Sequence, residues 1–575
     1  MFLRSSSRLR RAAIAAALGA GLVVPLAGIA VAGPSSPATP SSVSDAAAGK
    51  RAYFVITEPS NVAAGKKAVT DNGGTVFNSF DAIGVIVAHS EIADFATKVR
   101  QVSGVQQVGA TRTSDVPAAA TNPAIPSAPS QVTPGAESIG WDIKQVKADL
   151  AWTKTEGEGA IVAVLDTGVD DAHADIKPNF DYEKSVSCAY GKVDARQGAW
   201  RDVAGVSHGT HVAGTIGAAK NNLGMVGVAP KAKIRAVRVA EAGNELFFPE
   251  NTVCAFVYAA DSGAHVTNNS YWTDPWWGLC ATDADQKAIA EGINRAVRYA
   301  KDKGLINLVA AGNESKDYAN KGSISVSPND SSPVNRNVSG CKLMPQEADG
   351  ATVVSGIDQQ GNRYSGSNFD TNGAVDVTAG GVNVNSTVKG GRYSQLTGTS
   401  MASPHAAGVA ALIKAANPTF TGAQIEAKMK ETAGGYTDAK YYGAGLPNAQ
   451  KAVEGGAPQP GTSWQNDNDV QITDNNVAVT SSVTANGEAA PSATSTVNVD
   501  IVHSYIGDLA IDLVAPDGTV FALKPAVAHD ATRNLVKAYT VNLSGETSTG
   551  DYKLRVRDAY KYDTGYINSW KLTIG

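Results

Sequence analysis

Hydrophobic residues follow three different patterns along the chain, and each pattern predicts a different folded part. Residues 52–57 and 82–88 are short apolar runs rich in aromatic and β-branched side chains, which is typical of strands. Residues 61–72 are helix-like and end at a Gly-Gly pair, and apolar residues recur at helical spacing again from Ile92 to Val102. The pattern predicts a small α/β unit over residues 50–115, followed by a loose Pro/Ala/Ser stretch from 116 to 134.

From residue 139 to 453, strand-like and helical runs alternate. Strands are predicted at 161–165, 234–239, 266–268 and 305–310. This alternation predicts an α/β fold in which a parallel sheet is sandwiched between crossover helices.

Beyond residue 464 the period changes to two. Leu509, Ile511 and Leu513 alternate with polar residues, as do Trp570, Leu572 and Ile574. Residues 464–575 are therefore predicted to be an all-β sandwich. The intervening segment 455–461, GGAPQPG, has the composition of a linker.

The N-terminus has the pattern of a secretory signal. Four arginines stand within the first eleven residues, before an apolar, Ala-rich run that ends in Ala-Val-Ala at position 32. A membrane anchor is the alternative, but no Lys/Arg stop-transfer cluster follows. No later segment has the roughly 18 uninterrupted apolar residues of a spanning helix. We therefore predict export, cleavage of residues 1–32, and no membrane attachment afterwards.

Composition narrows the class of protein further. A chain of 575 residues is too long for one compact core, so several domains are expected. Loss of the four leader arginines would take the formal charge from −5 to −9, which gives no reason to expect a nucleic-acid partner. The four cysteines are too widely spaced for a CxxC zinc cluster, and their even number favours two disulfides in an oxidising compartment.

The segment AVLDTGVD, residues 163–170, contains an Asp-Thr-Gly triplet that is compatible with two kinds of protease. An aspartic protease needs two such triplets, with carboxylates about 3 Å apart on matched lobes. The second triplet begins at Asp563, but it follows Lys561-Tyr562 instead of an apolar strand and lies in the β-sandwich. We therefore interpret that triplet as a surface turn and Asp166 as part of another site.

Two further motifs accompany Asp166. SHGTHVAGT places His208 at the start of a Gly/Ala-rich helix, and the HExxH pattern of zinc helices is absent there. GTSMASPHAAG places Ser400 at the start of another helix, where backbone N–H groups lack partners. One such serine is usually only a helix cap. Three elements in the order Asp, His, Ser are typical of a catalytic triad.

These three segments resemble those of the subtilisin-like serine proteases, and the resemblance runs from about Trp141 to Val453. Subtilisin is the reference example for this triad order, so the roles are those that the resemblance implies. Ser400 would be the nucleophile, His208 the general base, and Asp166 the group that orients His208. Asn313, in the segment LVAAGN, would stabilise the oxyanion together with the Ser400 backbone N–H.

The flanking parts also resemble domains found in this family. The unit over 50–115 resembles the inhibitory propeptide, which implies a folding chaperone and product-like inhibitor. The segments HSYIGDLAIDLVAPDGT and TGYINSW resemble the P-domain of proprotein convertases. Dibasic specificity is not implied, because it depends on acidic residues of the catalytic domain that the sequence does not locate.

The resemblance also implies a substrate site. One wall would be Ser270, Tyr271 and Trp272, where many subtilisins have Ser-Leu-Gly; the other would be Ala310, Ala311 and Gly312. The aromatic residues of the first wall, with Trp276 and Trp277, could line an apolar subsite or cover the sheet edge. Loops that follow the two walls would be neighbours, which favours the disulfide Cys280–Cys341 and leaves Cys188–Cys254.

Calcium is the one metal that the resemblance implies. Asp175 matches a carboxylate ligand, but the loop from Lys220 to Met225 is one residue shorter than the family's calcium loop. Calcium needs six to eight oxygens at set positions, so a structural calcium is left open there. The acidic run 467–469 is interpreted as a solvated turn.

Together these features predict a secreted, calcium-assisted serine endopeptidase, made as a self-processing zymogen. It would act as a monomer on protein or peptide substrates, be inhibited by its own propeptide, and need no cofactor for the chemistry. Two alternatives remain. One is an exopeptidase of the same fold that releases short peptides from N-termini, and the other is a catalytically silent protein whose β-sandwich binds a surface partner.

Overall fold

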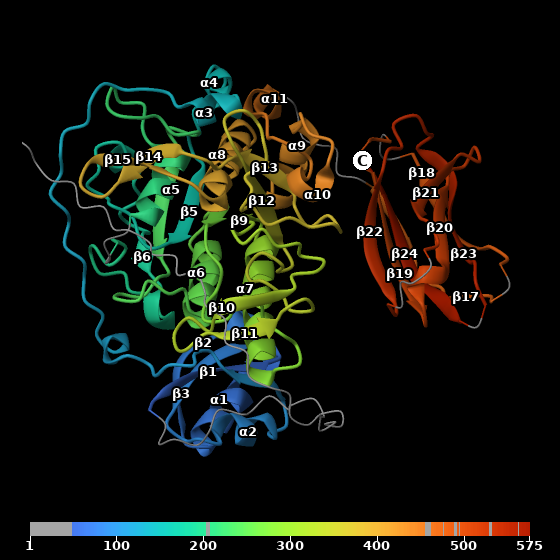
Figure 1. Ribbon diagram of the computed structural model, residues 1–575, viewed down its shortest axis with the longest axis horizontal. Coiled ribbons are helices and arrows are strands. Elements are labelled where there is room, and N and C mark those ends of the chain that lie inside the picture. Colours follow the sequence, from blue (N-terminus) through green and yellow to red (C-terminus); the bar gives the residue numbers. More distant parts are fainter. Residues whose placement is uncertain are drawn as a thin grey trace, which may run out of the picture. The chain divides into compact units, whose positions relative to one another are not determined.

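The computed structural model describes residues 49–202, 207–454, 462–474, 476–487, 491–493, 495–527, 532–561 and 563–575 (Figure 1). The predicted leader, 1–32, and the predicted linker, 455–461, lie outside these ranges. Within them, no helix combines the length and the apolar character needed to cross a membrane.

The N-terminal unit is a four-stranded antiparallel sheet with two helices. Its strands are β1 (Arg51–Thr57), β2 (Gly74–Phe80), β3 (Val85–Ser90) and β4 (Val105–Ala110), and their order is β2-β3-β1-β4. Helices α1 (Val62–Asp71) and α2 (Phe95–Arg100) share a core with one face of this sheet. The two predicted strands and two predicted helices are confirmed, whereas β2 and β4 carry weaker apolar patterns and were not predicted.

The central part contains a seven-stranded parallel sheet with the order β13-β12-β9-β8-β5-β7-β6. Its strands are β5 (Ile161–Asp166), β6 (Val186–Ser187), β7 (Lys233–Arg238), β8 (Val266–Asn269), β9 (Ile306–Ala310), β12 (Ala351–Ile357) and β13 (Val377–Gly380). Alternate residues of β5 enter two separate cores, Val162 and Val164 on one face, Ala163 and Leu165 on the other. The predicted parallel sheet, buried on both faces, is confirmed.

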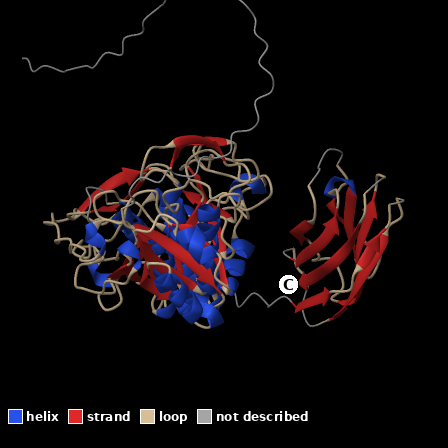
Figure 2. Ribbon diagram, turned by 90° about the horizontal axis from the view of Figure 1, so that it is seen from below, coloured by secondary structure: helices blue, strands red, loops and turns tan. Residues whose placement is uncertain are grey.

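Helices cover both faces of this sheet (Figures 1 and 2). The long helices α5 (His208–Gly217) and α8 (Thr399–Ala416) contribute to one core, and α6 (Pro249–Asp261) and α7 (Ala284–Asp302) contribute to the other. The remaining helices are α3 (Trp141–Gln145), α4 (Ala148–Ala151), α9 (Gly422–Thr432), α10 (Ala439–Tyr442) and α11 (Ala449–Glu454). Two hairpins complete this part: β10 (Ser323–Ser327) with β11 (Val334–Asn337), and β14 (Val384–Val388) with β15 (Arg392–Leu396).

The N-terminal unit packs on α7 through an apolar contact. Phe54 and Ile56 of β1 belong to the same buried core as Ile289 and Ile293 of α7. The Arg295 guanidinium donates hydrogen bonds to the carbonyl oxygens of residues 57 and 83 in the N-terminal unit, at 2.6 and 3.1 Å. The burial of these apolar side chains stabilises the packing of the unit on α7.

Two disulfides join segments of the central part. Cys188 pairs with Cys254, at a Cα–Cα distance of 5.7 Å, and Cys280 pairs with Cys341, at 4.2 Å. Cys280 lies between β8 and α7, and Cys341 lies between β11 and β12. The pairing implied by the family resemblance is therefore confirmed.

The C-terminal part is an all-β sandwich, as predicted. One sheet has the order β16-β24-β19-β22, with β17 also paired to β24, and the other has the order β18-β23-β20-β21. The strands are β16 (Thr462–Asn466), β17 (Val470–Ile472), β18 (Val479–Asn486), β19 (Ser495–His503), β20 (Leu509–Val514), β21 (Val520–Lys524), β22 (Leu535–Val541), β23 (Thr549–Asp558) and β24 (Gly565–Ile574). The predicted inward positions, including Leu509, Ile511, Trp570 and Leu572, are all buried in one core.

Two polar segments of the sandwich lie in connections between strands. Asp563 lies two residues before β24 and accepts a hydrogen bond from Ser504 Oγ at 2.6 Å, and Thr564 beside it is exposed. The acidic run 467–469 is an exposed connection between β16 and β17. The second Asp-Thr-Gly triplet thus belongs to the connection that enters β24, with Thr564 exposed, Asp563 half-buried and Gly565 buried in the strand, and not to a surface turn.

Candidate active site

The ends of β5 and α5 bring Asp166 and His208 together. Asp166 is the last residue of β5, and His208 is the first residue of α5. His208 Nδ1 donates to Asp166 Oδ1 at 2.8 Å, and the same oxygen accepts from the Thr167 backbone N–H at 2.7 Å. Asp166 is fully buried, while the His208 side chain is 24 % exposed. With its Nδ1 proton held by the carboxylate, the neutral imidazole has Nε2 available as a proton acceptor.

The pKa of His208 reflects two opposing influences. Burial lowers the pKa of an imidazole, because it disfavours the charged form. The adjacent Asp166 carboxylate outweighs burial here and, with a smaller contribution from Asp202, raises the pKa of His208 above its ordinary value of 6.5. The pair therefore stabilises the protonated imidazole, as a general base requires once it has taken a proton.

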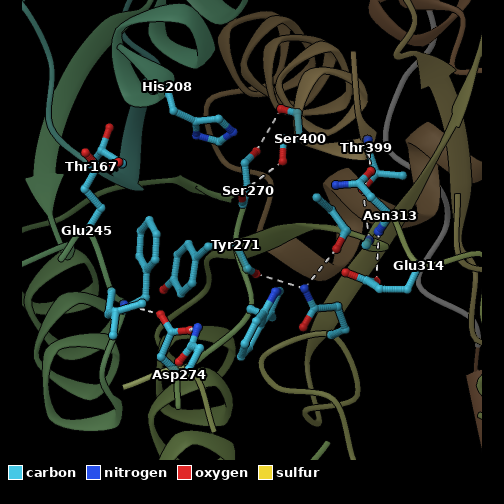
Figure 3. Close-up of a pocket in the computed structure, with 17 residues that line it drawn as sticks. Thr167, His208, Glu245, Ser270, Tyr271, Asp274, Asn313, Glu314, Thr399 and Ser400 are labelled. Carbon is cyan, nitrogen blue, oxygen red and sulfur yellow. Dashed lines mark hydrogen bonds between the residues drawn. The ribbon is translucent and has the colours of Figure 1, made fainter. Parts of the chain in front are cut away.

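Ser400 lies in the first turn of α8 and shares a pocket with His208 (Figure 3). Its hydroxyl donates to the Ser270 carbonyl oxygen at 3.1 Å, and Ser270 Oγ donates to the Ser400 carbonyl oxygen at 2.9 Å. The structure thus pairs Ser400 with Ser270, and it pairs His208 with Asp166. Catalytic hydrogen bonds of free enzymes often tighten only when substrate binds, and a serine hydroxyl changes partner by a change of χ1 rotamer.

Asn313 is held beside Ser400 by the residue that precedes the serine. Asn313 Oδ1 accepts from the Thr399 backbone N–H at 2.9 Å and from Thr399 Oγ1 at 3.2 Å. Because the carbonyl oxygen of the amide is occupied in this way, its NH₂ group is directed away from Thr399. Gly312, just before Asn313, has φ of 96° and a Cβ there would clash with Asn368, so this turn requires glycine.

The predicted walls line a pocket of about 370 Å³, with one exception. Ser270, Tyr271 and Trp272 line it, as do Ala310 and Gly312. Ala311 is fully buried in a neighbouring core instead, because alternate residues of an extended segment point to opposite sides.

The two aromatic pairs of this wall have different roles. Tyr271 and Trp272 line the pocket, and the Tyr271 ring stacks on Phe247 at 4.4 Å between centroids. Trp276 packs on the core beneath α6 and α7, with the Arg336 guanidinium 4.9 Å above its ring, and Trp277 is fully buried. Of the two interpretations of these aromatics, lining a subsite therefore fits the first pair, whereas the second pair packs into hydrophobic cores.

Several pocket residues were not predicted from the sequence. They come from six loops and the start of α8 and comprise Thr167, Glu245, Leu246, Phe247, Asp274, Glu314, Asn329, Gln346 and Thr399. Gln346 Nε2 donates to the carbonyl oxygens of Tyr271 and Ala310, at 2.9 and 3.0 Å, and so ties the two walls together. No local pattern marks Gln346, because its partners are 36 and 75 residues away.

The pocket has an acidic lining. Glu245, Asp274 and Glu314 line it, and its lining residues include no lysine or arginine. Asp274 accepts hydrogen bonds from the Phe247 N–H and from Asn329 Nδ2, the latter at 2.6 Å. Burial raises the pKa of Asp274 to about 7. The pocket therefore favours neutral or cationic groups over anionic ones.

The surroundings of Asp175 do not fit a calcium ion. Its carboxylate accepts hydrogen bonds from Tyr393 Oη at 2.8 Å, the Met225 N–H at 3.0 Å and Asn221 Nδ2 at 3.4 Å. Calcium requires oxygen ligands, and here hydrogen-bond donors face both carboxylate oxygens. Across the part of the chain that the structure describes, no group of three or more His, Cys, Asp or Glu side chains could hold a metal.

Comparison with known families gives two matches. Residues 157–445 match the subtilase family, and residues 492–574 match the proprotein convertase P-domain. The first range contains Asp166, His208, Asn313 and Ser400, and the second lies within the β-sandwich.

Individual relatives agree with the first match. The chain is 34% identical to M-protease of Shouchella clausii over 325 residues, which cover 56% of this chain and 72% of the relative. It is also 34% identical to subtilisin Savinase of Lederbergia lenta over 319 residues, 55% of this chain and all of that protein. The crystal structure of the epidermin leader peptide processing serine protease from Staphylococcus aureus shares the fold, with a TM-score of 0.57 at 22% identity, and covers 71% of this chain and 98% of that one.

Proposed function

Because this chain belongs to the subtilase family of serine proteases, we propose that it is a secreted endopeptidase made as a self-processing zymogen. The observation that carries the proposal is the convergence of His208, Ser400 and Asn313 on one acidic pocket, with Asp166 buried behind His208. Asp166 and His208 are already hydrogen-bonded, and Ser400 and Asn313 stand beside the same pocket. Peptides and proteins are the proposed substrates.

The proposed reaction begins with attack of Ser400 Oγ on the carbonyl carbon of the scissile bond. His208 Nε2 takes the hydroxyl proton and later gives it to the leaving amine, which leaves an acyl-enzyme. Asp166 keeps the His208 Nδ1 proton in place throughout. Water then hydrolyses the acyl-enzyme with His208 again as base. None of these steps needs a metal or a cofactor.

Charge develops on the carbonyl oxygen during both attacks. The Ser400 N–H is one of the first four N–H groups of α8, which have no partner inside the helix. Together with the Asn313 NH₂ group, it would donate to that oxygen.

The N-terminal unit, residues 50–115, is proposed to be the propeptide and inhibitor, and residues 139–453 the catalytic domain. The buried contact of β1 with α7 supports this assignment, because it holds the unit against the catalytic domain in the uncut chain.

Residues 1–32 are proposed as the export signal, 455–461 as a linker and 464–575 as the P-domain. The mature enzyme is proposed to be a monomer, with no membrane or nucleic-acid partner. A calcium ion at Asp175 is not part of the proposal.

An endopeptidase is favoured over an N-terminal exopeptidase. The pocket has walls from several loops on either side of Ser400, and an extended chain needs such a groove. Peptides with acetylated N-termini distinguish the two activities, because an endopeptidase cleaves them and an enzyme that must bind a free amine does not.

The triad is tested with three variants: one removes the Ser400 hydroxyl, one changes Asp166, and one makes the same Asp→Asn change at Asp563 as a control. Ser400→Ala should abolish turnover, leave the precursor uncut and prevent labelling by a fluorophosphonate, since one hydroxyl performs all three reactions. Asp166→Asn should lower kcat by several orders of magnitude, because the amide favours the wrong imidazole tautomer. Asp563→Asn, in the second Asp-Thr-Gly triplet, is the matched control and should retain activity. A wild-type protein that is not labelled would instead support the silent alternative.

A further inference from the structure

A single arginine of the N-terminal unit is buried in the catalytic domain. Arg112 follows β4 and is 4 % exposed. Its Nε donates to Glu250 Oε1 at 2.6 Å, and its Nη1 and Nη2 donate to the two carboxylate oxygens of Glu241, the first at 2.9 Å. The Phe248 ring lies 3.7 Å from the guanidinium carbon. Two carboxylates and one aromatic face therefore form a complete binding site for a guanidinium.

This site adjoins the candidate active site. The loop that follows Glu241 supplies three pocket-lining residues, Glu245, Leu246 and Phe247, and the Leu246 carbonyl oxygen accepts from the Glu241 N–H at 3.1 Å. The two residues after Arg112 bind the opposite side: the backbone N–H groups of Thr113 and Ser114 both donate to Asp330 Oδ2 at 2.9 Å. Asp330 is next to Asn329, which also lines the pocket. The segment after β4 thus lies along the rim of the pocket.

The proposed processing cut would remove Arg112 together with the propeptide. Glu241 and Glu250, each at most 2 % exposed while Arg112 covers them, would then face the vacated place without a cation. In the uncut chain, burial raises the pKa of Glu241 even beside Arg112. Glu250 Oε2 has no hydrogen-bond partner among the described residues. Two neighbouring carboxylates with no cation between them disfavour each other's charged form, so the emptied site favours a new cation.

We infer that Glu241, Glu250 and Phe248 form a substrate subsite of the mature enzyme that selects an arginine side chain. The inference rests on the proposed protease function and adds the substrate class. Arginine is preferred over lysine, because the planar guanidinium can bind Glu241 with two nitrogens, bind Glu250 with a third, and stack on Phe248. The propeptide and the substrate would use the same site in turn.

The test is a positional scan with mature wild-type enzyme and internally quenched peptides. A neutral reference peptide is compared with peptides that carry one arginine at each position from four residues before to three after the scissile bond. Citrulline, which has the same shape without the charge, and lysine are the comparators at each position. We expect arginine at one position to raise kcat/KM over citrulline on the order of tenfold or more, with lysine between them.

Variants then assign the preference to the two glutamates. Glu241→Gln and Glu250→Gln, each combined with Arg112→Gln so that the precursor contains no unpaired arginine, should reduce the arginine-to-citrulline ratio towards one. Glu183→Gln, which changes an exposed carboxylate that does not line the pocket, should retain the ratio. A ratio that persists in both double variants would overturn the inference.

The scan also separates this inference from the function on which it rests. Cleavage of the neutral peptide without arginine preference at any position would overturn the subsite and leave the protease assignment intact. Failure to cleave any peptide, together with failure of fluorophosphonate labelling, would overturn the proposed function and the subsite with it.

Discussion

At the scale of single residues, the environment of His208 determines the proton chemistry. Asp166 is fully buried and accepts the His208 Nδ1 proton, and its carboxylate raises the pKa of the imidazole against the effect of burial. Only the neutral imidazole can accept the Ser400 proton, so activity should increase as pH rises through this pKa.

The first prediction concerns the pH dependence of activity. Since the pKa of His208 is raised, the acidic limb of kcat/KM against pH should have its midpoint above 6.5. In the residual activity of Asp166→Asn, the midpoint should move down, because the carboxylate that raises the pKa has gone. An optimum near pH 3–4 would contradict this assignment and would revive carboxylate catalysis by the Asp-Thr-Gly triplets.

The second prediction concerns Asn313, whose side chain is oriented by Thr399. Asn313→Ala should lower kcat by about 10²–10³-fold with little change in KM, since the lost donor acts on the transition state; the magnitude is the one known for the equivalent donor of subtilisin. Kinetics on one neutral peptide, with thermal unfolding as a check on folding, provide the measurement. A rise in KM alone would instead indicate a role in substrate binding.

At the scale of elements, the loop from 221 to 225 is closed by hydrogen bonds to Asp175. The shortened loop brings the Met225 N–H to within 3.0 Å of Asp175 Oδ2, and Tyr393 of β15 donates to the same oxygen. Burial and the neighbouring Asp175 raise the pKa of Tyr393 well above its ordinary value, so its hydroxyl remains a donor at physiological pH. Hydrogen-bond donors of the protein thus bind the Asp175 carboxylate, which the family resemblance had suggested as a calcium ligand.

The third prediction tests this closure. Tyr393→Phe should reduce the free energy of unfolding by about 1–3 kcal/mol, because it removes a donor from a buried carboxylate. Tyr182→Phe, which removes a hydrogen bond from a tyrosine that is 40 % exposed, is the control and should cost less. A calcium-dependent rise in the wild-type Tm that disappears in Asp175→Asn would contradict the assignment.

At the scale of the whole molecule, the segment between the N-terminal unit and the catalytic domain decides where the chain can be cut. The sequence predicts a cut between Thr113 and Glu137. Within that range, Gln131 Nε2 donates to Asp170, and the Val132 N–H donates to the Gly390 carbonyl oxygen at 2.9 Å. The loose part of the segment therefore ends at about residue 130.

The fourth prediction is that the mature protein begins between residues 114 and 131. Extended, exposed chain can enter a protease groove without unfolding a domain, whereas residues from Gln131 onwards are held by the catalytic domain. Mass spectrometry of the mature N-terminus measures this directly, with the uncut Ser400→Ala precursor as reference. A first residue beyond Trp141 would contradict the domain organisation.

The sequence by itself was sufficient for the features that depend on neighbouring residues. Strand and helix periodicity indicated the parallel sheet and the β-sandwich, because burial on one or two faces imposes a local pattern. Likewise, each of the motifs around Asp166, His208 and Ser400 places one functional side chain at the end of a strand or at the start of a helix, and this can be recognised from neighbouring residues. The N-terminal unit was only partly predicted, since β2 has no buried residue and its pattern is correspondingly weak.

Tertiary structure alone decided the contacts that join distant segments. Gln346 bridges two walls, Tyr393 reaches Asp175 across 218 residues, and Arg112 binds Glu241 across 129. In each case the packing of the fold determines which polar group becomes the partner. These contacts affect stability because a polar or charged group that is buried without a partner is unfavourable. Sequence periodicity records which side of an element is buried, but it contains no information about which distant group meets it there.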